Sequence, residues 1–196
     1  MPVETRRYTI AEYLELEAKS QTKNEFHNGE ILAMAGGTFE QSIIKSNLMR
    51  VLGNRLEGKG CRALDSDMRV RIAGRSTYVY PDATVLCGPP QFDADDHNRT
   101  TILNPKVVIE VLSDSTEAYD RGEKFSLYRE IESLEEYVLV AQRSPRIEVF
   151  HRHPDGSWLF THFSGIEAIA KIRCVGIELP LREVYAGLDF AGEQAG

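Results

Sequence analysis

Two carboxylates interrupt segments that otherwise have the composition of buried β-strands. Asp82 lies in the apolar run 78–86, and Glu110 lies in the run 107–112. An ionised carboxylate inside a buried strand costs several kcal/mol unless a cation or several hydrogen-bond donors compensate it. The chain must therefore fold so that each carboxylate meets a partner. That partner is either a shared divalent metal ion or an arginine such as Arg69 or Arg71, and the spacing alone leaves both open.

Strand geometry favours bringing the two carboxylates together. Side chains alternate along a strand, so Val108, Glu110 and Leu112 share one face of the run. If 78–86 pairs beside 106–112, Asp82 and Glu110 lie close to each other, and their like charges repel unless a cation intervenes. Mg²⁺ prefers oxygen ligands and often takes only one or two protein carboxylates. The pattern therefore predicts a candidate magnesium site.

Composition is typical of a soluble globular protein with one domain, which we expect over residues 1–190, followed by a frayed tail at 191–196. The 196 residues are 42% hydrophobic and 27% charged. No segment approaches the 18 or so apolar residues of a membrane span, so we expect no membrane partner. Cys61, Cys87 and Cys174 are odd in number and widely spaced, which indicates reduced thiols and a cytoplasmic protein.

Charge is distributed unevenly along the chain. The net charge is −7, which argues against extensive phosphate contacts, because these need Lys and Arg. The segment 41–75 is different, since it holds eight Lys and Arg against three Asp and Glu, a net charge of +5. A basic segment within an acidic chain could form a phosphate-facing surface, with Lys45, Arg69 and Arg71 as candidate DNA contacts. Solvated charged faces on a helix and a strand explain the segment equally well.

The order of predicted elements indicates an α/β (α+β) fold with a central mixed sheet flanked by helices and an early hairpin. Thr9 and Glu12 form a capping box that opens a short helix, and Asn28-Gly29 predicts a type I′ hairpin turn. The segment 87–105 is expected to be a polar surface loop that could serve as a lid. Apart from these features, we predict helices at 41–57 and 120–131 and strands at 61–72, 78–86, 106–112, 136–141, 146–150 and 158–163.

The helix predicted at 120 carries a second polar group of residues. Asp120 can cap this helix and Glu123 can reach back to its start. Lys124 and Tyr128 follow Asp120 by four and eight residues, so all three share one helical face. A lysine near a phosphodiester could orient an attacking water or stabilise charge developing on phosphorus. A solvated lysine near a helix start is the plainer interpretation.

Four ordered segments resemble a known family. The segments are 25–30 (EFHNGE), 80–85 (YPDATV), 105–113 (PKVVIEVLS) and 119–128 (YDRGEKFSLY). They are similar to those of the Uma2-type restriction endonucleases, a group once classed as a domain of unknown function, within the PD-(D/E)XK nuclease superfamily. The likeness extends from about residue 8 to about residue 185. It implies a restriction-endonuclease-like fold.

The resemblance also implies roles for particular residues. Asp82 would be the acidic residue of the Pro-Asp motif and Glu110 that of the next motif, whose usual lysine two positions later is replaced here by Leu112. Lys124 is the natural substitute for that lysine. Glu25 is a weaker candidate that could approach the metal from the hairpin. In a supporting position, Gln41 stands where many relatives have histidine, and glutamine cannot titrate.

The leading hypothesis is a Mg²⁺- or Mn²⁺-dependent endonuclease that hydrolyses DNA phosphodiester bonds with metal-activated water. Asp82, Glu110 and the backbone carbonyl of Val111 would hold the ion, and Lys124 would position the water, with Asp120, Tyr128 and Gln41 supporting. One rival is a catalytically silent domain that binds nucleic acid or protein. Another is a metal-dependent hydrolase of small phosphoesters. A homodimer is expected from the superfamily, whose members commonly pair.

Overall fold

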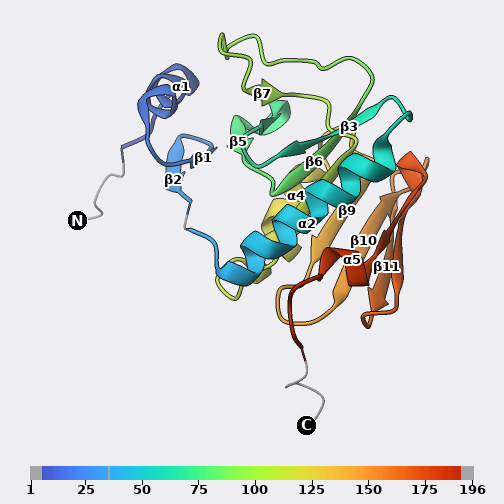
Figure 1. Ribbon diagram of the computed structural model, residues 1–196. Helices are drawn as coiled ribbons and strands as arrows, with labels where there is room; N and C mark the ends of the chain where they lie inside the picture. The colour runs from blue at the N-terminus through green and yellow to red at the C-terminus, as the bar shows by residue number, and fades with distance from the viewer. Residues whose placement is uncertain (1–5, 35, 191–196) are drawn as a thin grey trace.

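A six-stranded mixed sheet forms the centre of the molecule in the computed structural model, which describes residues 6–34 and 36–190 (Figure 1). Its strand order is β11-β10-β9-β8-β6-β3. β8 and β9 pair in parallel, and the other neighbouring strands are antiparallel. The strands are β3 (Cys61–Asp65), β6 (Ala83–Cys87), β8 (Val107–Val111), β9 (Glu136–Val140), β10 (Arg146–Arg152) and β11 (Trp158–Ser164).

A second sheet of five strands carries the N-terminal hairpin, in the order β2-β1-β5-β4-β7. Asn28 and Gly29 both have positive φ angles, 49° and 99°, so the predicted hairpin turn is confirmed. Helix α1 (Ile10–Lys19) begins with the predicted Thr9 and Glu12 capping box. The strands of this sheet are β1 (Asn24–His27), β2 (Glu30–Ala33), β4 (Arg69–Ile72), β5 (Thr77–Val79) and β7 (Thr101–Ile102).

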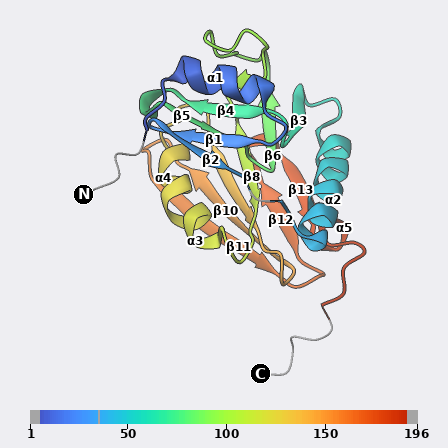
Figure 2. The ribbon, with the colours of Figure 1, turned by 90° about the vertical axis from the view of Figure 1, so that its left-hand side faces the viewer.

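Apolar side chains cover both faces of the six-stranded sheet. Helix α2 (Phe39–Leu56) packs on one face together with the hairpin of β12 (Ile169–Ile172) and β13 (Ile177–Pro180) and the short helix α5 (Leu181–Val184). The other face packs against α4 (Phe125–Tyr128) and parts of the five-stranded sheet. Figure 2 shows α2 and α5 on one side of the strands and α3 (Glu117–Tyr119) with α4 on the opposite side. The predicted mixed sheet flanked by helices is confirmed.

Several predicted boundaries change where the backbone turns. The strand expected at 61–72 divides into β3 and β4, and that expected at 78–86 divides into β5 and β6. The helix expected at 120–131 begins earlier, with α3, and continues through a π-helical turn, η2 (Asp120–Lys124), into α4. Asp120 therefore lies inside the helical segment and does not cap it. The hairpin of β12 and β13, the helix α5 and the short 3₁₀ turns η1 (Ala73–Arg75) and η3 (Arg173–Val175) have no predicted counterpart.

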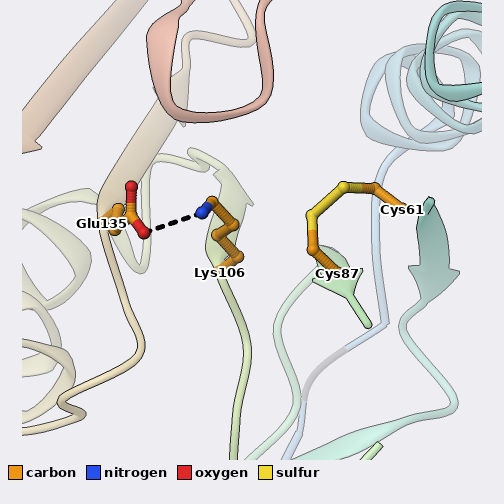
Figure 3. The surroundings of a disulfide bond; sticks show 4 residues. All are labelled: Cys61, Cys87, Lys106 and Glu135. Carbon is orange, nitrogen blue, oxygen red and sulfur yellow. Dashed lines mark hydrogen bonds and ion pairs between the residues drawn. A yellow bond between two sulfur atoms is a disulfide. The ribbon is translucent and has the colours of Figure 1, made fainter. Parts of the chain in front are cut away.

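The expectation of three reduced thiols is wrong. Cys61 and Cys87 form a disulfide between directly paired positions of β3 and β6 (Figure 3). Cys174 is a free thiol. The sequence signal was weak because the two cysteines are 26 residues apart and become neighbours only through strand pairing. Within the described part of the chain, no helix is both long and apolar enough to cross a membrane. The tail predicted at 191–196 lies outside the described residues.

The disulfide determines how many cysteines should react with a thiol reagent before and after reduction. Without reductant, the denatured protein should react with a thiol reagent at Cys174 alone, and reduction should expose Cys61 and Cys87 as well. Denaturation is needed because burial, with Glu136 nearby, raises the pKa of the Cys174 thiol and suppresses the reactive thiolate. Mass spectrometry after alkylation measures the number of modified cysteines. Full labelling of all three cysteines before reduction would contradict the disulfide.

Candidate active site

Residues from both sheets and from two helical segments line a cleft of about 340 Å³ at the N-terminal end of α2. β1 contributes Glu25 and α2 contributes Lys45. The acidic side chains of Asp82, Glu110 and Asp120 also line it, together with Lys124. The structure therefore brings the three principal catalytic residues predicted from the sequence into one cavity. Their neighbours and hydrogen bonds decide what the cavity can do.

Asp82 and Glu110 face each other across the pairing of β6 and β8. Ala83 pairs with Ile109, so Asp82, the residue just before β6, lies opposite Glu110. The backbone NH of Asp82 donates to Glu110 Oε2 at 3.3 Å, and the backbone NH of Val111 donates to Asp82 Oδ2 at 2.7 Å. Two backbone amides thus fix the two carboxylates side by side. The predicted proximity follows from this register.

Lysines compensate part of the buried negative charge. Lys124 Nζ lies 3.0 Å from Glu110 Oε1, 3.2 Å from Glu25 Oε1 and 3.7 Å from an oxygen of Asp120. Lys45 Nζ lies 2.6 Å from Asp82 Oδ1 and is more exposed than Lys124. The sequence predicted ion pairing with arginine as the alternative to a metal. The structure instead uses lysines, one from α2 and one from the π-helical turn.

Two uncharged side chains support the cleft from opposite sides. Tyr128 is fully buried, and its hydroxyl donates to Glu110 Oε1 at 2.8 Å. Gln41 donates from Nε2 to the carbonyl oxygen of Val111 at 3.1 Å. Its own Oε1 accepts from the backbone NH of Thr38, so the amide also caps α2. Gln41 therefore holds the loop before the helix against the end of β8.

Glu25 belongs to a network that the sequence analysis only partly identified. Its Oε1 accepts from the backbone NH of Tyr80 at 3.2 Å, and His27 Nε2 lies 3.2 Å from its Oε2. The Tyr119 hydroxyl lies 3.2 Å from the same nitrogen of His27. His27 and Tyr119 were not predicted as site residues. Two signals were available: alternation along β1 places Glu25 and His27 on one face, and His27 and Tyr119 both lie in segments that carry the family resemblance.

Charge in the cleft is not balanced by the described side chains. Four carboxylates, those of Glu25, Asp82, Glu110 and Asp120, face two lysines, which leaves a formal charge of −2 when all four carboxylates are ionised. Burial raises the pKa of Glu110 to about 8, although the positive charge of Lys124 lowers it. The nearby acidic groups Asp82 and Asp120 raise it further. Burial also raises the pKa of Asp120. The cleft therefore favours an additional positive charge.

The pKa values of Lys124 and Glu25 move so that both groups stay charged. Burial would lower the pKa of Lys124, but the carboxylates around it raise that pKa well above its ordinary range. Burial likewise opposes the ionisation of Glu25, yet Lys124 and the His27 and Tyr80 hydrogen bonds lower its pKa. Lys124 therefore acts near neutral pH as a protonated ammonium group. It can donate hydrogen bonds but cannot accept a proton.

Comparison with known proteins shows the family of this chain. The family model described as "Uma2: Putative restriction endonuclease" matches residues 10–182, which is most of the chain. The chain belongs to the Uma2 family. Two uncharacterised proteins of Synechocystis sp., slr1290 and sll1609, are each 36% identical to it, over 91% and 84% of this chain and 92% of their own lengths.

A solved structure shares the fold of this Uma2 protein. It is the crystal structure of a "putative nuclease belonging to DUF820" from Anabaena variabilis, with a TM-score of 0.73 and 15% sequence identity. The match covers 91% of this chain and 97% of that one. The restriction-endonuclease-like fold expected from the sequence is therefore confirmed. At this identity the likeness supports the fold alone.

The donor set of the Uma2 cleft fits a hard divalent cation. Asp82, Glu110 and the Val111 carbonyl offer oxygen atoms only, as Mg²⁺ and Mn²⁺ prefer. Over residues 6–34 and 36–190, no cluster of three or more His, Cys, Asp and Glu side chains forms a ready metal site. Mg²⁺ often needs only one or two protein carboxylates, with water and substrate completing its shell. The oxygen donors of the cleft are therefore compatible with such an ion.

Arg69 and Arg71 lie outside the cleft. Arg69 is buried and pairs with Asp96 at 3.0 Å, and Arg71 pairs with Asp93 and Asp95. These aspartates belong to the segment 87–105, which the two arginines tie to β4, and no residue of that segment lines the cleft. The expectation of a lid is therefore not met. Of the three candidate DNA contacts, only Lys45 lies at the cleft.

The raised pKa of Glu110 predicts a pH-dependent stability difference between the metal-free wild type and Glu110→Gln. Its pKa in the folded chain is higher than the ordinary value of 4.5, so the folded state favours the protonated form. The wild type's stability relative to the variant should be greatest below about pH 4.5 and should fall as the pH rises through about 8. Urea unfolding in the presence of a chelator, repeated across this range, measures it.

The stability difference between the wild type and Glu25→Gln should depend on pH in the opposite direction. The pKa of Glu25 is lowered in the folded chain, so its contribution should be present above its ordinary value of 4.5 and lost on acidification. A difference between wild type and Glu110→Gln that is independent of pH would contradict the charge imbalance described for the cleft.

Proposed function

We propose that this Uma2 protein is a divalent-metal-dependent endonuclease that hydrolyses phosphodiester bonds of DNA. The observation that carries the proposal is the meeting of Asp82, Glu110 and Lys124 in one cleft whose described side chains leave a formal charge of −2. One divalent cation would balance that charge. The family description and the shared fold support a nuclease-like hydrolase.

In this proposal Asp82 and Glu110 hold the cation, and the Val111 carbonyl is the third protein ligand. The amide of Gln41 contacts the same carbonyl at 3.1 Å and fixes its direction, while a second lone pair of the oxygen stays available. When bound, a divalent ion supplies Lewis-acid stabilisation of the charge developing on the phosphate and makes water more acidic. Tyr128 keeps the Glu110 carboxylate oriented through its hydroxyl.

Lys124 positions the attacking water and stabilises negative charge on the phosphate. Its ammonium group reaches Glu110 although it comes from a helical turn rather than from β8. Leu112, which occupies the usual position of this lysine, is buried in the core. The contact between Lys124 and Glu110 supports an active enzyme over a silent domain, because the displaced lysine still reaches the acidic pair.

Hydrolysis of small phosphoesters is the second candidate function. The cleft of about 340 Å³ is small, and Arg69 and Arg71 are committed to ion pairs away from it. Lys45, with its side chain 32% exposed, is the cation placed to meet a phosphate at the entrance. A homodimer stays a prediction. The exposed Leu159 and Phe160 on the edge strand β11 mark the first surface to examine for one.

Supercoiled DNA incubated with the purified protein tests the proposal directly. Nicking or linearisation should require Mg²⁺ or Mn²⁺ and should stop when a chelator is added. Asp82→Asn should lower the rate by about 100-fold or more, because the ion's contribution of several kcal/mol corresponds to a tenfold change per 1.4 kcal/mol. Gel electrophoresis over time measures the cleavage rate.

Glu135→Gln is the matched control, because Glu135 is an ion-paired carboxylate outside the cleft, bound to Lys106 (Figure 3). It should cleave at the wild-type rate. Cleavage that survives Asp82→Asn would contradict the assigned site. Metal-dependent hydrolysis of a small phosphodiester, without any cleavage of DNA, would favour the second candidate function.

A further inference from the structure

A second cavity, of about 460 Å³, lies at the other end of α2 from the cleft. It is formed by the C-terminal end of that helix and the hairpin of β12 and β13, which lie beside each other in Figure 2. Four of its lining side chains are cationic, and we call them the basic cradle: Arg55, Lys59, Lys171 and Arg173. One carboxylate, that of Glu178, also lines the cavity.

Most of the charge in the basic cradle is available to a ligand. Arg55 pairs with Glu183 at 2.9 Å. Within the described ranges, Lys59, Lys171 and Arg173 form no ion pair through their side chains, although Glu178 lies opposite Lys171 in the β12 and β13 register. All three are exposed. An acidic chain of net charge −7 thus concentrates unpaired cations around one hollow.

A buried carboxylate fixes the backbone that carries part of the basic cradle. Glu136 is fully buried and accepts from the backbone NH of Arg173 at 3.0 Å and of Cys174 at 3.3 Å. These two bonds fix the 3₁₀ turn η3, which ends at Gly176 with a φ of 61°. Lys59 reaches over this glycine, since a Cβ built on it would lie 4.0 Å from Lys59 Nζ. Arg173 is therefore carried by a fixed turn, Lys171 by β12, and Arg55 and Lys59 by the end of α2 and the residues just beyond it.

We propose that the basic cradle binds a phosphate group of the DNA backbone at a distance from the cleft. The identity of this ligand rests on the proposed function, whereas the preference for a phosphate rests on the cradle itself. Lys45 and Arg55 are ten residues apart on α2, about 15 Å along the helix axis at 1.5 Å per residue. That length corresponds to about four or five base pairs at 3.4 Å each. A ligand that occupies both the cleft and the cradle must therefore be a polymer. The small cleft alone would not distinguish a polymer from a small phosphoester.

Salt dependence of DNA binding tests the basic cradle without reference to cleavage. The affinity of a fluorescent DNA duplex is measured by anisotropy at several salt concentrations, in chelator, for wild type and for Lys59→Gln/Lys171→Gln/Arg173→Gln. Loss of one phosphate contact reduces the slope of log affinity against log salt by about 1, so the triple variant, whose three side chains surround one phosphate, should lose about 1. Thermal melting confirms that the variant is folded.

Lys19→Gln/Arg75→Gln/Arg129→Gln is the matched control, because it removes the same charge from exposed positions that line neither cavity. Its slope should stay at the wild-type value. The inference would be overturned if the slope of the cradle variant were unchanged or if both variants lost the same slope. It would also be overturned if the wild type bound inorganic phosphate but not DNA, or bound no DNA at all. DNA binding that depends on the cradle, in a protein that never cleaves, would uphold the cradle and reject the nuclease proposal.

Discussion

The crowding of four carboxylates, three of them buried, around two lysines is the constraint on which the rest of the site depends. Ionised carboxylates removed from water require compensation, and Lys45 and Lys124 supply only half of it. The two explanations that the sequence left open are therefore complementary. Lysine ion pairs neutralise two of the four carboxylates, and we propose that a divalent cation binds to balance the remaining formal charge of −2. The raised pKa of Glu110 is the expected consequence in the absence of the ion.

The sequence predicted the parts of the site that depend on local regularities. Strand alternation placed Glu110 on the face shared with Val108 and Leu112, and that face packs against α4 and the five-stranded sheet. The spacing of Asp120, Lys124 and Tyr128 predicted a common face. In the structure Lys124 and Tyr128 both reach Glu110, although a π-helical turn replaces the regular helix there. The family resemblance predicted Lys124 as the displaced lysine, which periodicity alone could not do.

Contacts between distant segments could not be predicted. Arg69 pairs with Asp96, which lies 27 residues later in a segment without periodicity, so a basic strand that looked available for DNA proved to be internal. Cys61 and Cys87 met for the same reason, through the pairing of β3 with β6. The basic cradle joins residues up to 118 positions apart, from Arg55 to Arg173, and depends on a hairpin that the sequence pattern did not reveal. In each case the tertiary fold, rather than residue type, decides which side chains become partners.

Calorimetric titration of the metal-free protein with Mn²⁺ tests the central claim most directly, because it requires no substrate. The account predicts binding of about one ion per chain, accompanied by proton release near neutral pH, since a ligating carboxylate must be ionised. Binding should be lost in Asp82→Asn and in Glu110→Gln and retained in Glu135→Gln. An absence of any binding heat, or equal affinity in the wild type and both cleft variants, would contradict the claim that the unbalanced charge of this cleft is a cation site.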